Sequence, residues 1–109
     1  MNIFERIKYR RRYKRTWGTP IGQDCISLDT TLCKWLGERM LFLAEHTQSF
    51  DPRYVSFEEW QRTLRVNAYA LLGWANHWDC GSVDEEHAAY EQAQAALRWI
   101  ADNLGTLWD

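Results

Sequence analysis

Basic and aromatic side chains are concentrated at the start of the chain. Seven of its thirteen Lys and Arg residues fall within the first 17 positions, interspersed with aromatic residues: Arg6, Lys8, Tyr9, Arg10, Arg11, Arg12, Tyr13, Lys14, Arg15 and Trp17. Guanidinium groups form paired hydrogen bonds with phosphates, and flat aromatic rings stack on bases. We therefore expect Arg11, Arg12 and Arg15 to bind phosphates, and Tyr13 and Trp17 to bind bases, of a nucleotide or nucleic acid.

The charge of the chain is divided between two regions. Residues 1–17 carry seven basic side chains against one acidic side chain, a net +6, whereas residues 18–109 carry six against fourteen, a net −8. The net charge of −2 conceals this asymmetry. Two interpretations of the basic segment stay open: it binds an external anion, or it is a solvated segment that pairs with the acidic body.

Three polar residues interrupt the apolar faces of the predicted helices. Arg39, His46 and Asn67 fall between large apolar residues at helical spacing. One interpretation is structural: Arg39 pairs with Glu86 of the last helix, or its stem packs while its guanidinium reaches water. The other is a polar pocket between helices, in which Arg39 binds a phosphate or carboxylate of a ligand.

Sequence motifs of catalysis and metal binding are absent. The chain has no G-x-x-x-x-G-K-[ST], G-x-G-x-x-G, H-E-x-x-H or G-x-S-x-G pattern. His77 and Cys80 lack the second pair of ligands that a zinc site needs. We therefore expect a binding protein with no enzymatic activity, no cofactor and no metal.

Capping signals predict an all-α fold with three long helices. Ser56 and Ser82 each precede a Glu by three residues, the capping-box pattern that starts a helix. Asp29 is the expected N-cap of an earlier helix, and Gly81 is expected to end the middle helix in the left-handed conformation. The predicted helices extend from Asp29 to about Gln48, from about Phe57 to Trp78 and from about Val83 to Leu104.

The basic segment is predicted to be separate from this three-helix bundle. Residues 1–17 form either an arm or a short helix capped by Asn2, because some of the same residues also alternate as a strand would. Residues 18–109 form one helical domain, which their number suits.

The predicted helices carry more apolar surface than a three-helix monomer covers. Projection at about 100° per residue gives each helix a main apolar face. These faces comprise Leu28, Leu32, Trp35, Leu36, Phe42 and Leu43; Trp60, Leu64, Leu71, Trp74 and Trp78; and Val83, Tyr90, Ala93, Leu97, Ile100, Ala101 and Leu104. Val66, Tyr69 and Leu72 lie on a second face, and Trp99 lies behind the last main face. The second faces predict a symmetric homo-oligomer.

No segment of the sequence predicts a membrane span or a signal peptide. No apolar run approaches about 18 residues, and the N-terminus lacks an apolar core. Cys25, Cys33 and Cys80 make no disulfide framework, which fits a reducing compartment. We expect reduced thiols and a cytoplasmic protein without membrane contact.

Three stretches of the sequence resemble a family of small phage-encoded helical proteins. They are Ile26–Met40, which has a Ser-Leu-Asp helix start followed by Arg39, the Ser56–Trp60 stretch with Glu-Glu-Trp, and the ending Leu107-Trp108-Asp109. The shared pattern extends over residues 20–109. The resemblance implies a viral protein that acts in the cytoplasm of the infected host cell.

By analogy of size and origin, this resemblance implies a role against host defence. Some small phage proteins are helical oligomers that sequester cyclic or ADP-ribose-type nucleotide signals without cleaving them. We predict such a sponge for a small nucleotide-type anion. The predicted ligand-binding residues are Arg11, Arg12, Tyr13, Arg15, Trp17, Arg39, His46 and Asn67. The alternative is an accessory module that binds nucleic acid or another protein through the basic segment.

Overall fold

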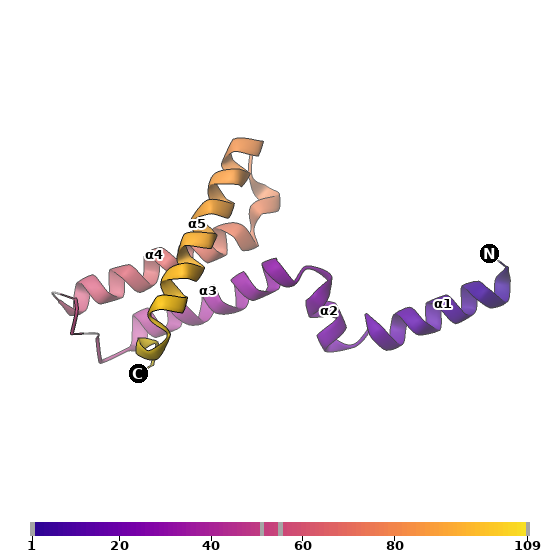
Figure 1. Ribbon diagram of the computed structural model, residues 1–109, viewed down its shortest axis with the longest axis horizontal. Helices are drawn as coiled ribbons and strands as arrows, with labels where there is room; N and C mark the ends of the chain where they lie inside the picture. The colour runs from indigo at the N-terminus through magenta and orange to yellow at the C-terminus, as the bar shows by residue number, and fades with distance from the viewer. Residues whose placement is uncertain (1, 51, 55, 109) are drawn as a thin grey trace.

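The computed structural model describes residues 2–50, 52–54 and 56–108, and these residues are helical with connecting loops and no strand. Its elements are α1 (Ile3–Thr16), α2 (Pro20–Ile26), α3 (Leu28–His46), α4 (Phe57–Ala75), η1 (His77–Asp79), α5 (Val83–Asp102) and η2 (Leu104–Thr106). Figure 1 shows their order along the chain. The predicted all-α class is confirmed. The last residue of the Leu-Trp-Asp ending, Asp109, lies outside the described residues.

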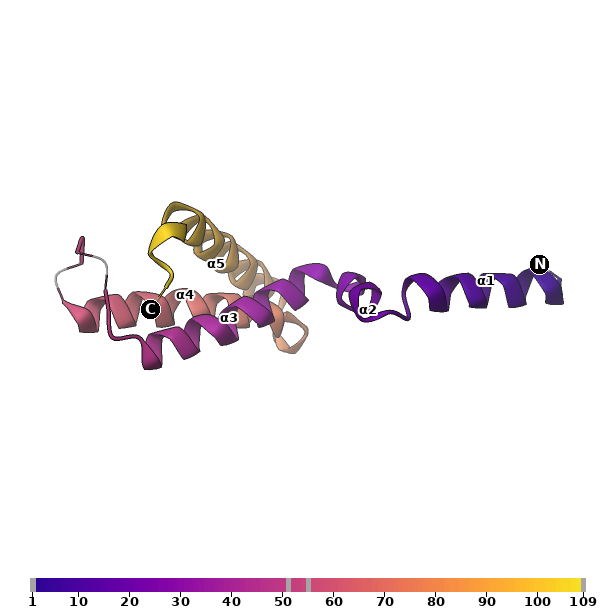
Figure 2. The same ribbon diagram turned by 90° about the horizontal axis from the view of Figure 1, so that it is seen from below.

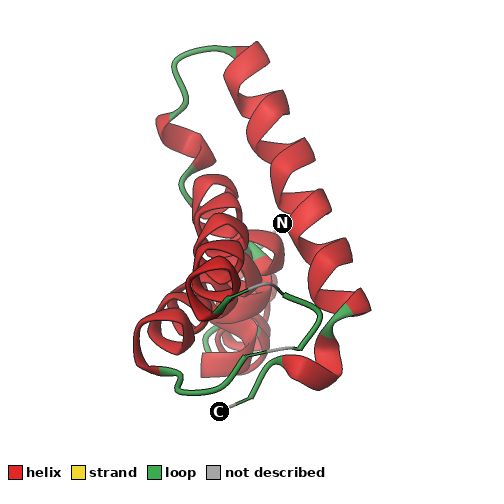
Figure 3. Cartoon of the chain, turned by 90° about the vertical axis from the view of Figure 1, so that its left-hand side faces the viewer, coloured by secondary structure: helices red, strands yellow, loops and turns green. Residues whose placement is uncertain are grey.

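Helices α3, α4 and α5 form the bundle that contains the core. The helices α3 and α4 run antiparallel, and α5 crosses them at a steep angle (Figure 1, Figure 3). The helix α4 packs against both neighbours. The buried core comprises Cys33, Met40, Ala44, Trp60, Leu64, Ala68, Leu71, Ala96 and Ile100. The apolar stripe predicted for α4 is thus confirmed at Trp60, Leu64 and Leu71.

Helix α3 approaches α4 most closely at Gly37. A Cβ atom at this position would lie 2.8 Å from Leu72 Cγ and 3.1 Å from the carbonyl oxygen of Ala68. Glycine lets the two backbones come this near because it has no side chain. Leu72 therefore faces α3, and the prediction that it belongs to an outward second face is wrong.

Only part of the predicted apolar face of α3 is turned toward the bundle, where Leu36 and Leu43 pack against the core. The side that α4 covers carries Cys33, Gly37, Met40 and Ala44. The predicted core residues Leu28, Leu32, Trp35 and Phe42 are exposed instead. The small residues allow the close approach of the two helices, and this packing decides which side of α3 is buried.

Several apolar residues predicted for the other main faces are also exposed. Trp78, Val83 and Leu104 lie at or beyond helix ends, where no neighbouring helix covers them. The prediction that they are buried is wrong. Trp99 is half-buried and turned inward, since its Nε1 donates to the Tyr54 hydroxyl at 3.2 Å. It therefore belongs to the margin of the core.

The predicted helix starts at Ser56 and Ser82 are confirmed. Each Ser Oγ accepts a hydrogen bond from the backbone N–H three residues later, at 3.1 Å in both cases. The Glu85 carboxylate accepts from the N–H of Gly81 at 2.8 Å. Gly81 does not take the predicted left-handed conformation, and no described residue has a positive φ. Both helices end earlier than predicted, at Ala75 and Asp102.

The N-cap of α3 lies two residues earlier than predicted. Ser27 takes the N-cap position, and α3 ends at His46. Asp29 does not cap the helix; its carboxylate accepts a hydrogen bond from Trp74 Nε1 at 3.0 Å. This carboxylate therefore joins α3 to α4.

Helix α2 is a short element that the sequence analysis did not predict. Thr19 caps it and Pro20 occupies its first turn, and this Thr-Pro pair is the signal that was missed. Together α1 and α2 extend away from the bundle (Figure 2). The chain measures 66 × 33 × 21 Å, and its radius of gyration of 18.8 Å exceeds the value of about 13 Å for a compact domain of this length.

Candidate nucleic-acid interface

The basic segment forms the regular helix α1. The Asn2 carboxamide oxygen accepts from the N–H of Glu5 at 2.9 Å, and the Glu5 carboxylate accepts from the N–H of Asn2 at 3.3 Å. This reciprocal pair is a capping box. Lys14 and Arg15 lie in the last turn, where positive charge interacts favourably with the helix dipole. The helical option of the sequence analysis is therefore confirmed.

The side chains of α1 are all accessible. Every residue from Ile3 to Thr16 is exposed. At about 100° per residue, the seven cations follow one another over about two thirds of the circumference of the helix. Tyr9 and Tyr13 lie on the remaining third. Among the described residues no carboxylate lies within ion-pair distance of these cations, so the structure does not show them pairing with the acidic body.

A compact joint connects α1 to the rest of the molecule. The Thr19 hydroxyl donates to the carbonyl oxygen of Thr16 at 2.9 Å and accepts from the N–H of Gly22 at 3.0 Å. The Gln23 amide donates to the carbonyl oxygen of Trp17. Gly22 is buried, and a Cβ atom there would overlap Thr16 O and lie 2.6 Å from Trp17 Cα. These contacts set the direction in which α1 leaves the body.

The surface of α1 contains a hollow of about 430 Å³. The residues that line it are Ile7, Tyr9, Arg10, Arg11, Tyr13 and Lys14. The volume is comparable to that of small-ligand sites. Because the lining comes from a single helix, the hollow contacts a ligand from one side only. Of the predicted ligand-binding residues, Arg11 and Tyr13 line this hollow.

Arg39 lies at the surface, so of its two structural interpretations the one with the guanidinium at water fits and the ion pair does not. It is exposed, its guanidinium lies 4.1 Å from the centre of the Trp35 ring, and Nη1 donates to the carbonyl oxygen of Trp35 at 3.1 Å. The expected ion pair with Glu86 is not formed, since Glu86 is exposed on another helix and accepts no bond from Arg39. Arg39 lines neither the hollow on α1 nor the groove between α4 and α5, and its role as a ligand-binding residue stays a prediction. The contact with Trp35 is a cation–π interaction at the surface.

His46 and Asn67 are also separate from α1. His46 is exposed and stacks on Phe42, with ring centres 4.1 Å apart. The Asn67 amide donates to the carbonyl oxygen of Thr63 at 2.9 Å, within its own helix. Asn67 lines a groove of about 710 Å³ between α4 and α5. The eight predicted residues therefore fall at three places: Arg11 to Trp17 at the N-terminus, Arg39 and His46 on α3, and Asn67 on α4.

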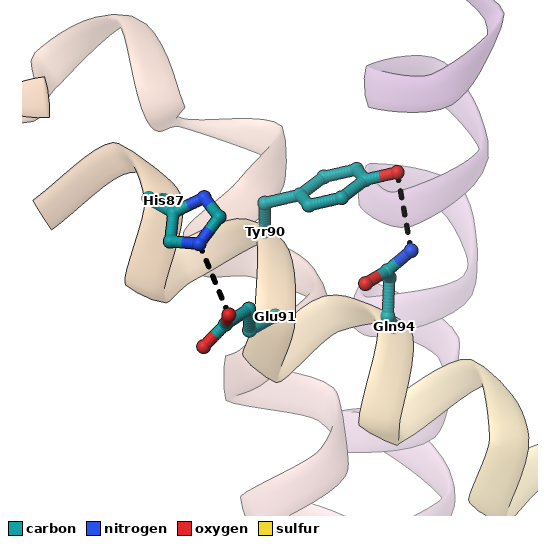
Figure 4. A network of polar contacts seen from close by, with 4 residues as sticks. All are labelled: His87, Tyr90, Glu91 and Gln94. Carbon is teal, nitrogen blue, oxygen red and sulfur yellow. Dashed lines mark hydrogen bonds and ion pairs between the residues drawn. The ribbon is translucent and has the colours of Figure 1, made fainter. Parts of the chain in front are cut away.

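A second polar cluster lies along α5, and its Tyr90 also contacts the ring of Trp74 on α4, with ring centres 5.1 Å apart. Figure 4 shows His87 Nε2 beside the Glu91 carboxylate at 3.0 Å, and the Gln94 amide donating to the Tyr90 hydroxyl at 3.1 Å. The two residues of each pair are four positions apart along α5. Such pairs stabilise a helix by a few tenths of a kcal/mol, roughly 0.2 to 0.5. These contacts stabilise α5, and the four residues that Figure 4 labels do not include a third partner for the His87–Glu91 pair.

The cysteines form no reactive or metal-binding centre. All three are free, with Cys25 exposed and Cys33 buried. Burial, reinforced by the charge of Asp29, raises the pKa of the Cys33 thiol, so it stays protonated at neutral pH. The described residues contain no group of three His, Cys, Asp or Glu placed to hold a metal ion. No described helix is long and apolar enough to span a bilayer.

No protein family, curated protein or solved structure matches the chain. The resemblance to small phage proteins stays a prediction.

Proposed function

We propose that the chain is a non-enzymatic binding protein whose helix α1 binds the phosphate backbone of a nucleic acid. One observation carries the proposal: seven cations project from a single helix on which no side chain is buried. A helix in a bundle uses one side for packing. Since α1 uses none, each of its cations is available to a partner.

The distribution of the cations around α1 fits a partner that has a groove better than a partner with a flat surface. B-DNA has a major groove about 12 Å wide, which admits an α-helix between two rows of phosphates. Cations over about two thirds of the helix circumference reach both rows at once. Double-stranded RNA has a major groove too deep and narrow for a helix to enter. We therefore favour duplex DNA as the partner.

The charge of the body orients the complex. Residues 18–109 carry a net −8, and the first turn of α5 alone contains Asp84, Glu85 and Glu86. Phosphates repel this region and attract α1. The body then points away from the nucleic acid while α1, held by the joint at Gly22, makes the contacts.

A small nucleotide-type anion is the second candidate. The hollow on α1, with its tyrosines and cations, supports it. Small ligands are usually buried over about 70–90% of their surface, however, and one helix covers a single side. Sequestration in an infected host cell would need a second surface to close over the ligand, so we rank it below a duplex.

The test compares two variants that lose the same charge. Arg11, Arg12 and Arg15 are changed to Gln in one protein, and the exposed Arg62, Arg65 and Arg98 of the bundle are changed to Gln in the other. Binding to a labelled DNA duplex of about 20 base pairs, roughly two helical turns, is measured by fluorescence anisotropy. At about 1 kcal/mol for each lost contact, the α1 variant should bind on the order of a hundredfold more weakly.

The bundle variant should bind as tightly as the unsubstituted protein, or slightly more weakly through net charge. Equal losses in the two variants would show that total charge, not α1, controls binding. Tighter binding of a cyclic or ADP-ribose-type nucleotide than of the duplex would favour the second candidate. An RNA duplex of the same length provides the third comparison, and it should bind more weakly than DNA.

A further inference from the structure

Six residues of α3 form a continuous exposed seam along one side of the helix. They are separated alternately by four and three positions, and all six are exposed: Leu28, Leu32, Trp35, Arg39, Phe42 and His46. Trp35 is 54% exposed and Phe42 is 64% exposed. Alternating spacings of four and three are those of the a and d positions of a coiled coil, which face a partner helix.

This seam lies opposite the side that α4 covers, and at Leu32 it borders a hollow that Tyr90 and Leu97 of α5 also line. Helix α4 packs on Cys33, Gly37, Met40 and Ala44, about half a turn away from the seam. A helix that is apolar on both sides is normally covered on both sides. Exposure of Trp35 and Phe42 costs the most free energy, because an aromatic side chain buries about 150–250 Å² when a partner covers it.

Contacts within the seam already order its side chains. The guanidinium of Arg39 lies over the Trp35 ring at 4.1 Å, and the rings of Phe42 and His46 stack at 4.1 Å with an angle of 17° between their planes. Ordered side chains lose less rotamer freedom when a partner packs on them. The seam is therefore prepared for packing against another helix.

We propose that the occupant of this seam is α3 of a second copy of the chain, packed antiparallel. A parallel pair would place Arg39 against the partner's Arg39, two like charges in contact. An antiparallel pair centred near Gly37 places Arg39 against the partner's Trp35, where cation–π attraction replaces repulsion. The same register places Leu32 opposite the partner's Phe42 and Leu28 opposite the partner's His46.

Charges beside the seam favour the same orientation. Lys34 and Glu38 are both exposed and lie on the same flank of α3. In an antiparallel pair each flank meets the same flank of the partner, so Lys34 lies near the partner's Glu38 and Glu38 near the partner's Lys34. Two such pairs, related by the two-fold axis, add attraction between opposite charges to the antiparallel arrangement.

The antiparallel dimer has a consequence for α1. The N-terminal end of α3 leads through α2 to α1 (Figure 2). Two antiparallel α3 helices therefore send their α1 helices toward opposite ends of the dimer. If α1 binds nucleic acid as proposed above, the dimer presents two binding helices, and its affinity for a long duplex exceeds that of the monomer.

The assembly is tested by one substitution in the seam and a matched one outside it. Phe42→Glu changes a residue that is 64% exposed, and Val66→Glu changes a residue of α4 that is 62% exposed. Light scattering at about 50 µM, a concentration that reveals a weak interface, should show a dimer for the unsubstituted protein and for Val66→Glu, and a monomer for Phe42→Glu. Circular dichroism checks that each variant folds, and Leu32→Glu replaces Phe42→Glu if that variant does not.

Two outcomes would overturn the seam dimer. One is an unsubstituted protein that is monomeric at this concentration. The other is a dimer that Val66→Glu dissociates and Phe42→Glu leaves intact, which would assign the interface to the groove between α4 and α5. Neither outcome affects the anisotropy comparison of the α1 and bundle variants, so failure of the dimer is distinguishable from failure of the proposed function.

Orientation is tested by disulfide crosslinking of two proteins mixed before oxidation. One carries Leu32→Cys and the other Phe42→Cys, both in a background with Cys25→Ser and Cys80→Ser; the remaining Cys33 is buried. The antiparallel register predicts crosslinks between the two different proteins. Crosslinks confined to identical proteins would show a parallel pair and overturn the proposal.

Discussion

Helix α1 and the bundle use their large side chains in opposite ways. In the bundle, Trp60 is 2% exposed and lies between the rings of Tyr54 and Trp99, with ring centres 5.0 and 5.8 Å away. In α1 no side chain is buried, although the helix carries two tyrosines and three other large apolar residues. The sequence of α4 is thus constrained by packing, whereas that of α1 is free to match a partner. This contrast is the basis for assigning binding to α1.

The largest effect that tests this contrast is the loss of an indole from each region. Trp60→Ala should lower the free energy of unfolding by about 3 to 5 kcal/mol, because it leaves a cavity in a packed core. Trp17→Ala, at a position that is 39% exposed beyond the end of α1, should lower it by less than about 1 kcal/mol. Urea denaturation followed by circular dichroism measures both. Similar losses would mean that the end of α1 belongs to the cooperative core.

Substitution of two glycines in the bundle helices should change stability by smaller amounts and in opposite directions. Gly37→Ala should destabilise the protein by about 1 to 2 kcal/mol, because the added Cβ meets Leu72 and the backbone of Ala68. Gly73→Ala should stabilise it by about 0.5 to 1 kcal/mol, because nothing lies within 4 Å of the added atom and alanine favours the helix. Changes of the same sign in both variants would contradict the close approach of α3 and α4.

The smallest stability effect concerns the joint between α1 and α2. Gly22→Ala should change the free energy of unfolding by less than about 0.5 kcal/mol, because the joint lies outside the core. It should nevertheless alter the direction of α1, since the added atom overlaps Thr16 O. Small-angle scattering should therefore show a changed radius of gyration for Gly22→Ala and none for Gly105→Ala, where the added atom meets nothing. An unchanged scattering curve would mean that the joint does not direct α1.

Local signals predicted the helices well because they act over a few residues. Ser56 and Ser82 start α4 and α5 where the capping pattern placed them. The same kind of signal, Thr19 before Pro20, was present for α2 and was overlooked. The predicted ends of α4 and α5 lie beyond the observed ends, because neither helix is terminated by a glycine with a positive φ.

The sides on which the helices pack were harder to predict, because the choice depends on contacts between distant residues. Periodicity gave α3 a wide apolar face, yet the buried side is the one with Gly37 and Ala44, which allow close approach. The same reason explains the errors at the candidate site. Arg39 was expected to pair with Glu86, to extend its guanidinium to water or to line a polar pocket, and it lies on the exposed seam beside Trp35. Only α1, whose residues are contiguous in sequence, was predicted as a unit.

The salt dependence of DNA binding tests the central claim most directly. Each phosphate contact contributes about −0.9 to the slope of log K against log salt concentration for duplex DNA. If α1 makes the contacts, replacing Arg11, Arg12 and Arg15 by Gln should reduce the magnitude of that slope by about 2 to 3, while replacing Arg62, Arg65 and Arg98 leaves it unchanged. A slope that is the same in the α1 variant and the unsubstituted protein would contradict the assignment of binding to this helix.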